Sequence, residues 1–235
     1  MRFGVAVFPG TWSDRDSAHA AELAGQESVF LWHKDADLRG ADCVILPGGF
    51  SYGDHLRCGA IARFAPLMDA VVEFAATGGL VWGICNGFQI LCEARLLPGV
   101  LMRNASLEFR CMPASLRVET TATPFTALTS RGDVLQVPVS HGEGRYVAEP
   151  QTLLDLESQD RVVFRYTAPD GGPAGEEWNP NGSMRDIAGI VNEGRNVLGM
   201  MPHPERSCEA LLGSDDGLRL FLSVARTLDR EGAVA

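Results

Sequence analysis

The stretch from Leu80 to Leu91 reads LVWGICNGFQIL, and it decides the fold of this 235-residue chain. Its first residues form a short apolar run that predicts a buried β-strand, and its last residues continue as a helix. Between them stands Cys85, with a glycine two residues to either side. A nucleophile on such a sharp turn is held in a strained backbone conformation, and glycine at those two places avoids a clash. The stretch predicts Cys85 as a nucleophile above a helix N-terminus, where the helix dipole favours thiolate; a buried structural cysteine is the alternative.

Strand and helix patterns alternate on either side of this unit. Before it, apolar runs predict strands over residues 2–8, 28–32 and 43–46, and helical patterns predict helices over 13–26, with Ser13 as N-cap, and over 58–76. This order predicts a parallel sheet with helices on both faces and a ligand crevice at the carboxyl ends of its strands. Residues 107–166 are richer in strands and turns, which predicts an antiparallel extension. Strands over 187–191 and 197–201 and a helix opening at 214–216 complete the expected α/β fold.

Composition excludes several classes of function. Apolar residues make up 46% and charged residues 21%, as in ordinary globular proteins, and no repeat or long linker divides the chain, so a single domain over residues 1–235 is expected. A net charge of −10 argues against nucleic acid or an anionic membrane as the partner. No G-x-x-x-x-G-K-[ST] phosphate loop is present, so ATP chemistry must use other parts or another chain. The six cysteines show no C-x-x-C pairing and the N-terminus shows no leader pattern, which predicts reduced thiols and a cytoplasmic location.

A thiolate nucleophile needs a base, and the histidines compete for this role. His203 lies in the run MPHPE just past a predicted strand end, and Pro204 favours an extended backbone there. Side chains two apart in an extended chain point to the same side, so Glu205 is expected to reach the His203 ring and fix its tautomer. His141 and Glu143 have the same spacing but lie between glycines, so they are better candidates for a substrate-contact loop. His19 and His33 are interpreted as structural.

These residues resemble a known family. The run GICNGFQ at 83–89, with the distant His203-Pro204-Glu205, is similar to class I (triad) glutamine amidotransferases. Further segments narrow the resemblance to the glutaminase subunits of phosphoribosylformylglycinamidine synthases, enzymes of purine synthesis. These segments are PGGFSYGD at 47–54, RCGAIAR at 57–63, SHGEG at 140–144, NPNGS at 179–183 and VLGMMPHPER at 197–206. The resemblance implies one glutamine amidotransferase type 1 domain of flavodoxin-like topology, with a mostly parallel sheet flanked by helices and an antiparallel extension in the middle.

The resemblance also implies roles for individual residues. Cys85 would attack the side-chain amide of L-glutamine and form a thioester, with His203 as acid and base and Glu205 orienting the ring. The backbone N–H groups of Gly49 and Asn86 would stabilise the oxyanion.

Substrate binding is expected at Gln89 and at the backbone of Ser140 and His141, near the α-amino and α-carboxylate groups of glutamine. One segment departs from the family, which usually has Ser-Asn-Cys-Asp where this chain has TWSD at 11–14. The role of that loop is left open.

The same resemblance implies partners. Ammonia would pass to a large synthetase subunit that uses ATP and Mg²⁺ to convert formylglycinamide ribonucleotide (FGAR) to formylglycinamidine ribonucleotide (FGAM), with a small third subunit bridging in bacterial complexes. No cofactor or metal is expected in this chain itself. The isolated chain is expected to be a poor glutaminase until a loaded partner completes its oxyanion hole.

Two rival functions remain at this stage. One is another hydrolase with a cysteine on such a turn, of the DJ-1/PfpI-like kind, although such proteins generally lack the His-Pro-Glu run. The other is a non-catalytic scaffold subunit with a decayed triad, against which the intact Cys85, His203 and Glu205 argue.

Overall fold

The computed structural model describes residues 1–232, with side chains described as far as Asp229, so the last three residues of the expected domain 1–235 lie outside the described part. The strands are β1 (Arg2–Val7), β2 (Glu27–Trp32), β3 (Cys43–Leu46), β4 (Leu80–Ile84), β5 (Val100–Met102), β6 (Arg110–Val118), β7 (Val134–His141), β8 (Arg145–Val147), β9 (Val162–Thr167), β10 (Ile187–Val191) and β11 (Val197–Met200). The α-helices are α1 (Asp14–Leu23), α2 (Pro66–Ala76), α3 (Asn86–Glu93), α4 (Pro150–Ser158), α5 (Gly175–Trp178) and α6 (Leu218–Gly232).

One large sheet organises the molecule, with the strand order β2-β1-β3-β4-β11-β10-β9-β6-β7. The pairings from β2 across to β11 are parallel, and those from β11 across to β7 are antiparallel. Strands β5 and β8 form a separate antiparallel pair. The predicted α/β fold, with a parallel sheet flanked by helices and an antiparallel extension built from the middle of the chain, is confirmed.

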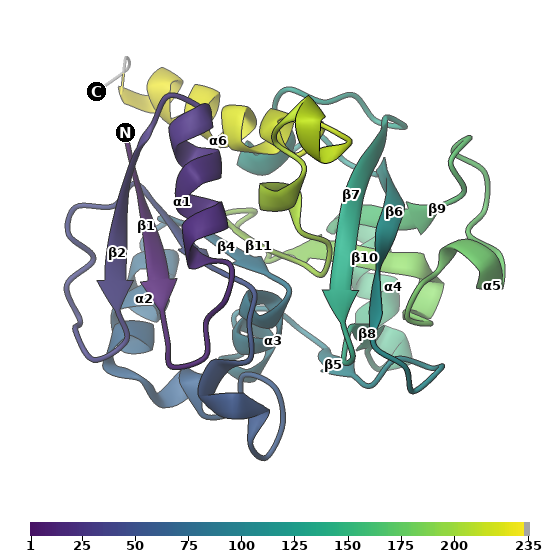
Figure 1. The fold of residues 1–235 in the computed structure, drawn as a ribbon, viewed down its shortest axis with the longest axis horizontal. Helices are drawn as coiled ribbons and strands as arrows, with labels where there is room; N and C mark the ends of the chain where they lie inside the picture. The colour runs from purple at the N-terminus through teal and green to yellow at the C-terminus, as the bar shows by residue number, and fades with distance from the viewer. Residues whose placement is uncertain (233–235) are drawn as a thin grey trace.

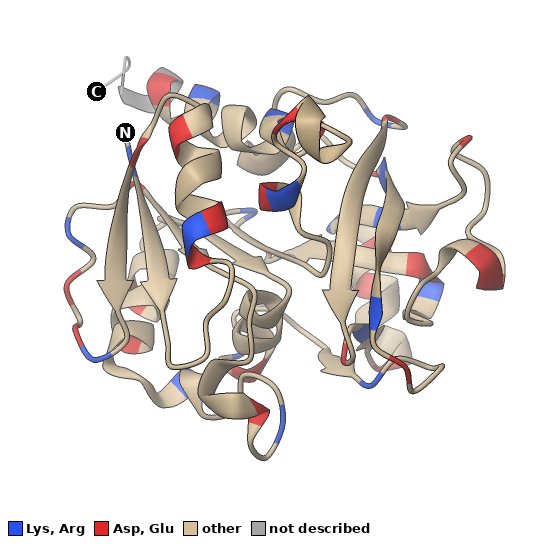
Figure 2. Ribbon diagram, viewed as in Figure 1, with Lys and Arg blue, Asp and Glu red and all other residues tan. Residues whose placement is uncertain are grey.

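Helices cover both faces of the parallel half. Helix α1 packs on β1 and β2 and is drawn to the right of β1 in Figure 1, whereas α2 lies behind these strands. Helix α6 packs on the sheet through Phe221, whose ring centroid lies 4.8 Å from that of Trp82 and 6.1 Å from that of Phe3. Strands β3, β4, β10 and β11 are buried along their whole length because they are covered on both faces. Accordingly, these four strands contain no Lys, Arg, Asp or Glu, and the charged residues lie on other parts of the chain (Figure 2).

Three local predictions differ from the structure. The helix predicted over 58–76 begins only at Pro66, because proline suits the first helical position and the preceding segment instead turns across α3, where Gly59 has a φ of +78°. Ser13 precedes α1 but does not cap it, since its Oγ accepts a hydrogen bond from Arg206 Nη2 at 2.8 Å. Helix α4, which begins at Pro150, falls in a region predicted to be strands and turns.

Among residues 1–232, no helix combines the length and the apolar character that crossing a membrane requires.

Candidate active site

Cys85 stands on a strained turn between β4 and α3. Its φ of +51° lies in the region that favours glycine, and its ψ is −106°. The flanking glycines make this turn possible, because a Cβ on Gly87 would lie 1.8 Å from the Leu46 carbonyl oxygen and one on Gly83 would lie 2.7 Å from the Gly87 carbonyl oxygen. The turn therefore has the geometry that the sequence predicts for a nucleophile, and the thiol is only 5% exposed.

His203 and Glu205 meet beside this turn. Strand β11 runs parallel to β4, and the Cys85 N–H donates to the Met200 carbonyl at 2.8 Å, so the segment after β11 passes next to Cys85. The His203 N–H donates to the Pro138 carbonyl at 2.8 Å, and the ring nitrogen Nδ1 lies 2.6 Å from Glu205 Oε1. A Cβ on Gly48 would lie 2.6 Å from the ring, so glycine at this position leaves room for the imidazole.

The charge of the His203 ring is set by its two neighbours. Burial alone would lower the pKa of His203, but the Glu205 carboxylate and the Cys85 sulfur outweigh it and raise the pKa to about 10. The second oxygen of Glu205 has no hydrogen-bond partner, and the nearest cation besides the ring is Arg206, with Nε 3.9 Å from Oε1. The buried carboxylate is therefore compensated mainly by the imidazolium, which favours a charged ring at neutral pH.

The other ring nitrogen of His203, Nε2, is buried without a hydrogen-bond partner. Its neighbour is the Cys85 thiol, whose closeness contributes to the raised pKa of His203, yet the contact does not have hydrogen-bond geometry. Contacts between catalytic groups commonly tighten only when substrate binds. The arrangement leaves one imidazole nitrogen available beside a sulfur, which is what proton transfer to a leaving group requires.

Gly49 and Asn86, whose backbone N–H groups are predicted to bind the oxyanion, both lie near Cys85, since Gly49 lines the same pocket and Asn86 follows Cys85 in the chain. Asn86 is the first residue of α3, whose first N–H groups have no partner within the helix. Gly49 has a φ of +150°, and a Cβ there would lie 2.6 Å from the Gly10 carbonyl oxygen. The loop that departs from the family pattern holds this turn, because the N–H groups of Trp12 and Ser13 both donate to the Gly48 carbonyl, at 3.0 and 3.1 Å.

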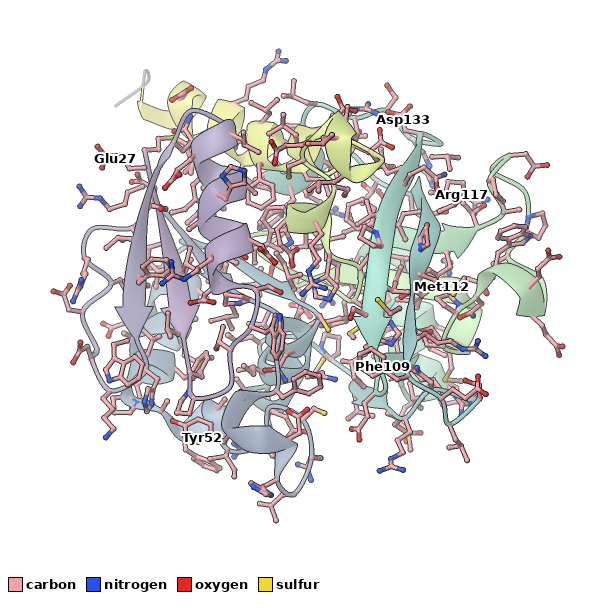
Figure 3. All side chains as sticks on the ribbon, in the orientation of Figure 1. Glu27, Tyr52, Phe109, Met112, Arg117 and Asp133 are labelled. Atoms are coloured by element: carbon pink, nitrogen blue, oxygen red, sulfur yellow. The ribbon has the colours of Figure 1, made fainter. Side chains whose placement is uncertain are left out.

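A pocket of about 160 Å³ opens over Cys85 and contains the predicted binding residues. Its wall includes Gly49, Gln89, Ser140 and His141. Two loops border it, one after β3 that carries Phe50 and Asp54, and one before β6 that carries Phe109, which is labelled in Figure 3. Among the described residues, no group of three or more His, Cys, Asp or Glu side chains could hold a metal ion.

The side chain of Gln89 is already committed to the protein. Its Nε2 donates to the Glu143 carbonyl at 2.6 Å, and its Oε1 accepts from Asn86 Nδ2 at 2.8 Å. Gln89 thus joins the Glu143 loop to the first turn of α3, which makes it a wall of the pocket.

His141 is more rigid than its neighbouring glycines suggested. It is the last residue of β7, is 3% exposed, and its Nδ1 lies 3.2 Å from Asn104 Oδ1. Burial, and then the charge of His203, lower the pKa of His141 to about 4, so the ring is neutral.

Sequence reasoning missed several residues of the pocket, among them Phe109 and the thiol of Cys58. Cys58 lines it together with Asp54 and Glu143, and its Sγ donates to Glu143 Oε2 at 3.2 Å. The only signal was its place in the segment RCGAIAR, where nothing distinguishes a pocket thiol from a core thiol.

Comparison with known proteins gives a consistent picture. Residues 1–215 match the family described as the CobB/CobQ-like glutamine amidotransferase domain. The chain is 58% identical over 224 residues to the phosphoribosylformylglycinamidine synthase subunit PurQ of Salinibacter ruber, covering 95% of each protein. It is 54% identical over 230 residues to PurQ of Thermus thermophilus, covering 98% of this chain and 100% of that protein.

Solved structures agree. A chain in the structure of PurLQS from Thermotoga maritima superposes with a TM-score of 0.85 at 42% identity, covering 97% of this chain and 98% of that one. A glutamine amidotransferase from the same organism, at 15% identity and a TM-score of 0.55, shares the fold. The chain thus belongs to the glutamine amidotransferase family, and within it to the PurQ subunits of phosphoribosylformylglycinamidine synthase.

Proposed function

We propose that this chain is the glutaminase subunit of a phosphoribosylformylglycinamidine synthase, acting as a single domain that hydrolyses L-glutamine to glutamate and ammonia for purine biosynthesis. The observation that carries the proposal is the His203 imidazole, held by Glu205 at 2.6 Å with its Nε2 unpartnered beside the strained Cys85 turn. A scaffold subunit would have no need of this arrangement.

The first half-reaction forms a thioester. The Cys85 thiolate attacks the carboxamide carbon of glutamine, and the carbonyl oxygen becomes an oxyanion that the N–H groups of Gly49 and Asn86 bind. The C–N bond then breaks as His203 Nε2 gives its proton to the departing nitrogen, so that neutral ammonia leaves. Glu205 keeps the ring in the orientation, and the tautomer, that points Nε2 at the reacting atoms.

The second half-reaction releases glutamate. The neutral His203 ring takes a proton from a water molecule, and the resulting hydroxide attacks the thioester carbon. The same two N–H groups bind the second oxyanion, the C–S bond breaks, and the thiolate–imidazolium pair returns.

Ammonia must reach its acceptor without protonation, because ammonium is not a nucleophile. We propose that the chain docks on a large synthetase subunit, bridged by a small third subunit, and that the synthetase supplies the ATP and Mg²⁺ with which FGAR becomes FGAM. The structure of PurLQS from Thermotoga maritima supports an assembly of this kind for that relative. We place the complex in the cytoplasm.

The test is the variant Cys85→Ala in the reconstituted complex. Glutamine-dependent FGAM formation is expected to fall to background, while formation from added ammonium salt continues at the wild-type rate, because only the thiol chemistry is removed. Cys111→Ala, which removes an exposed thiol on β6, is the matched control and should leave both activities unchanged. Equal loss of both activities in Cys85→Ala would mean that Cys85 is structural, and would refute the assignment.

A further inference from the structure

Two carboxylates line the same pocket as Cys85 and share one weak donor. Asp54 and Glu143 both belong to the pocket wall, and Cys58 lies between them. The Cys58 thiol donates to Glu143 Oε2 at 3.2 Å and also interacts with the Asp54 carboxylate. A thiol carries a single proton and is a poor donor, so it cannot compensate two negative charges.

Other contacts leave this pair short of positive charge. Asn86 Nδ2 donates to Asp54 Oδ1 at a long 3.4 Å, and Arg103 Nε lies 3.6 Å from Glu143 Oε1 with its own side chain 75% exposed. No lysine or arginine is among the residues that line the pocket. Burial and the repulsion of Glu143 raise the pKa of Asp54. The hydrogen bonds from Cys58 and Asn86 act in the opposite direction but do not outweigh them. The pocket therefore contains negative charge that lacks a full partner.

The carboxylates are held at a fixed place relative to the nucleophile. Asn86, next to Cys85, contacts Asp54 and donates to Gln89 Oε1 at 2.8 Å. Gln89 in turn donates to the Glu143 carbonyl at 2.6 Å. The first turn of α3 thus anchors both acidic loops, and the pocket that their carboxylates line, of about 160 Å³, also opens on Cys85.

We propose that Asp54 and Glu143 bind the α-ammonium group of the substrate glutamine, and that Cys58 is a positioning residue that keeps the two carboxylates apart. Glutamine carries its single cation at the end of the molecule away from the reacting amide. An ammonium group has three donors, so it can satisfy both carboxylates at once, and a charge-assisted pair in a partly dry pocket is stronger than one in water. This inference rests on the proposed glutaminase function and adds to it the basis of substrate selection.

The experiment compares glutamine with glutaramate, which is glutamine without its α-amino group, using the full-length chain in its reconstituted complex. Ammonia release gives kcat/KM for each substrate. The wild-type chain is expected to prefer glutamine by about 100-fold or more, because a pocket built to pair a polar group rejects the analogue that lacks it. Equal kcat/KM values for the two substrates would overturn the inference without any variant.

The isosteric variants Asp54→Asn and Glu143→Gln then locate the effect. Each should lower kcat/KM for glutamine by about 10- to 100-fold, the worth of a hydrogen bond to a charged group, and leave kcat/KM for glutaramate within a few-fold. Glu73→Gln, an exposed carboxylate on α2, is the control and should change neither value.

Two other results have distinct meanings. If the variants lower both substrates equally, the carboxylates have a structural role and the inference is wrong, while the glutaminase function stands. If the wild-type complex hydrolyses neither substrate and forms no glutamyl thioester at Cys85, the proposed function fails and this inference fails with it.

Discussion

Replacing Glu205 with glutamine tests the electrostatic basis of the site. Glu205→Gln keeps the size of the side chain but removes the charge that lies 2.6 Å from His203 Nδ1. At an effective dielectric constant near 20, the attraction between unit charges at this distance is about 6 kcal/mol. Burial lowers the pKa of the ring, and in Glu205→Gln the carboxylate no longer opposes this effect. The pKa of His203 is therefore expected to fall from about 10 toward or below its ordinary value of 6.5.

The loss should appear in both catalysis and thiol reactivity. Losing the group that orients the catalytic imidazole is expected to lower kcat for glutamine hydrolysis by about 10⁴-fold. The charged His203 ring lies beside the Cys85 sulfur, and a nearby positive charge favours reaction of a cysteine with electrophiles. The rate of alkylation by iodoacetamide at neutral pH should therefore be lower in Glu205→Gln than in the wild-type chain.

The matched control is Glu209→Gln. Glu209 Oε2 lies 3.0 Å from His19 Nε2 on the surface, so this variant removes a histidine–carboxylate pair of the same chemistry from an exposed position. It should leave both kcat and the alkylation profile unchanged. The reasoning is refuted if Glu205→Gln retains kcat within about tenfold of wild type with an unchanged alkylation profile, because the carboxylate would then contribute little to the state of the pair.

The raised pKa of His203 also predicts a dependence of stability on pH. The folded state holds this proton more tightly than the unfolded state does, so the contribution is fully present below pH 6.5 and is lost as the pH rises toward about 10. The free energy of unfolding, measured in urea between pH 7 and 10, should therefore fall less steeply for Glu205→Gln than for the wild type. Equal slopes would contradict the link.

Two further substitutions test other parts of the structure. In the folded chain the pKa of His141 is about 4, below its ordinary value of 6.5, so protonation of this ring favours the unfolded state and stability is lost as the pH falls from about 6.5 to 4. In His141→Gln the free energy of unfolding, measured in urea, should depend less on pH between those values. An unchanged slope would contradict the argument from burial. Gly87→Ala places a Cβ 1.8 Å from the Leu46 carbonyl oxygen and should destabilise the chain by about 3 kcal/mol or more. In the control Gly78→Ala the new Cβ meets no atom, so this variant should cost only about 1 kcal/mol, because of the positive φ at this position. Equal urea midpoints for the two variants would contradict the steric explanation of the turn.

Much of the fold followed from local patterns in the sequence. Strands β3 and β10 begin and end where their apolar runs do, because buried strands on both sides of a sheet show as continuous apolar segments between turn residues. The predictions of secondary structure were wrong where contacts between residues far apart in the sequence determine the backbone conformation. The segment before Pro66 has helical spacing, yet it turns because Gly59 packs against the backbone of Ile90. A Cβ on Gly59 would lie only 2.8 Å from the Ile90 nitrogen.

The residues of the candidate active site also fall into those that the sequence could predict and those that it could not. Cys85 could be found from sequence because its flanking glycines answer a steric demand only a few residues long, and His203 with Glu205 because extended backbone brings alternate side chains together. The sequence indicated that the loop of Glu143 contacts substrate, but it could not show that Asp54, Cys58 and Glu143 form one acidic wall. Asp54, Cys58 and Glu143 come from loops that meet only when β3, β4 and β7 are placed in one sheet, and the hydrogen bonds that hold those loops run through Asn86 and Gln89.

The sequence by itself thus determined the candidate nucleophile, its candidate base and the order of strands and helices, since each depends on neighbours close along the chain. Only the tertiary structure decided the charge of the His203 ring and the shortage of positive charge around Asp54 and Glu143. Both depend on burial and on distances between residues far apart in sequence, such as the 85 positions that separate Cys58 from Glu143. Charges interact through space, so the electrostatics of this pocket exists only once the chain has folded.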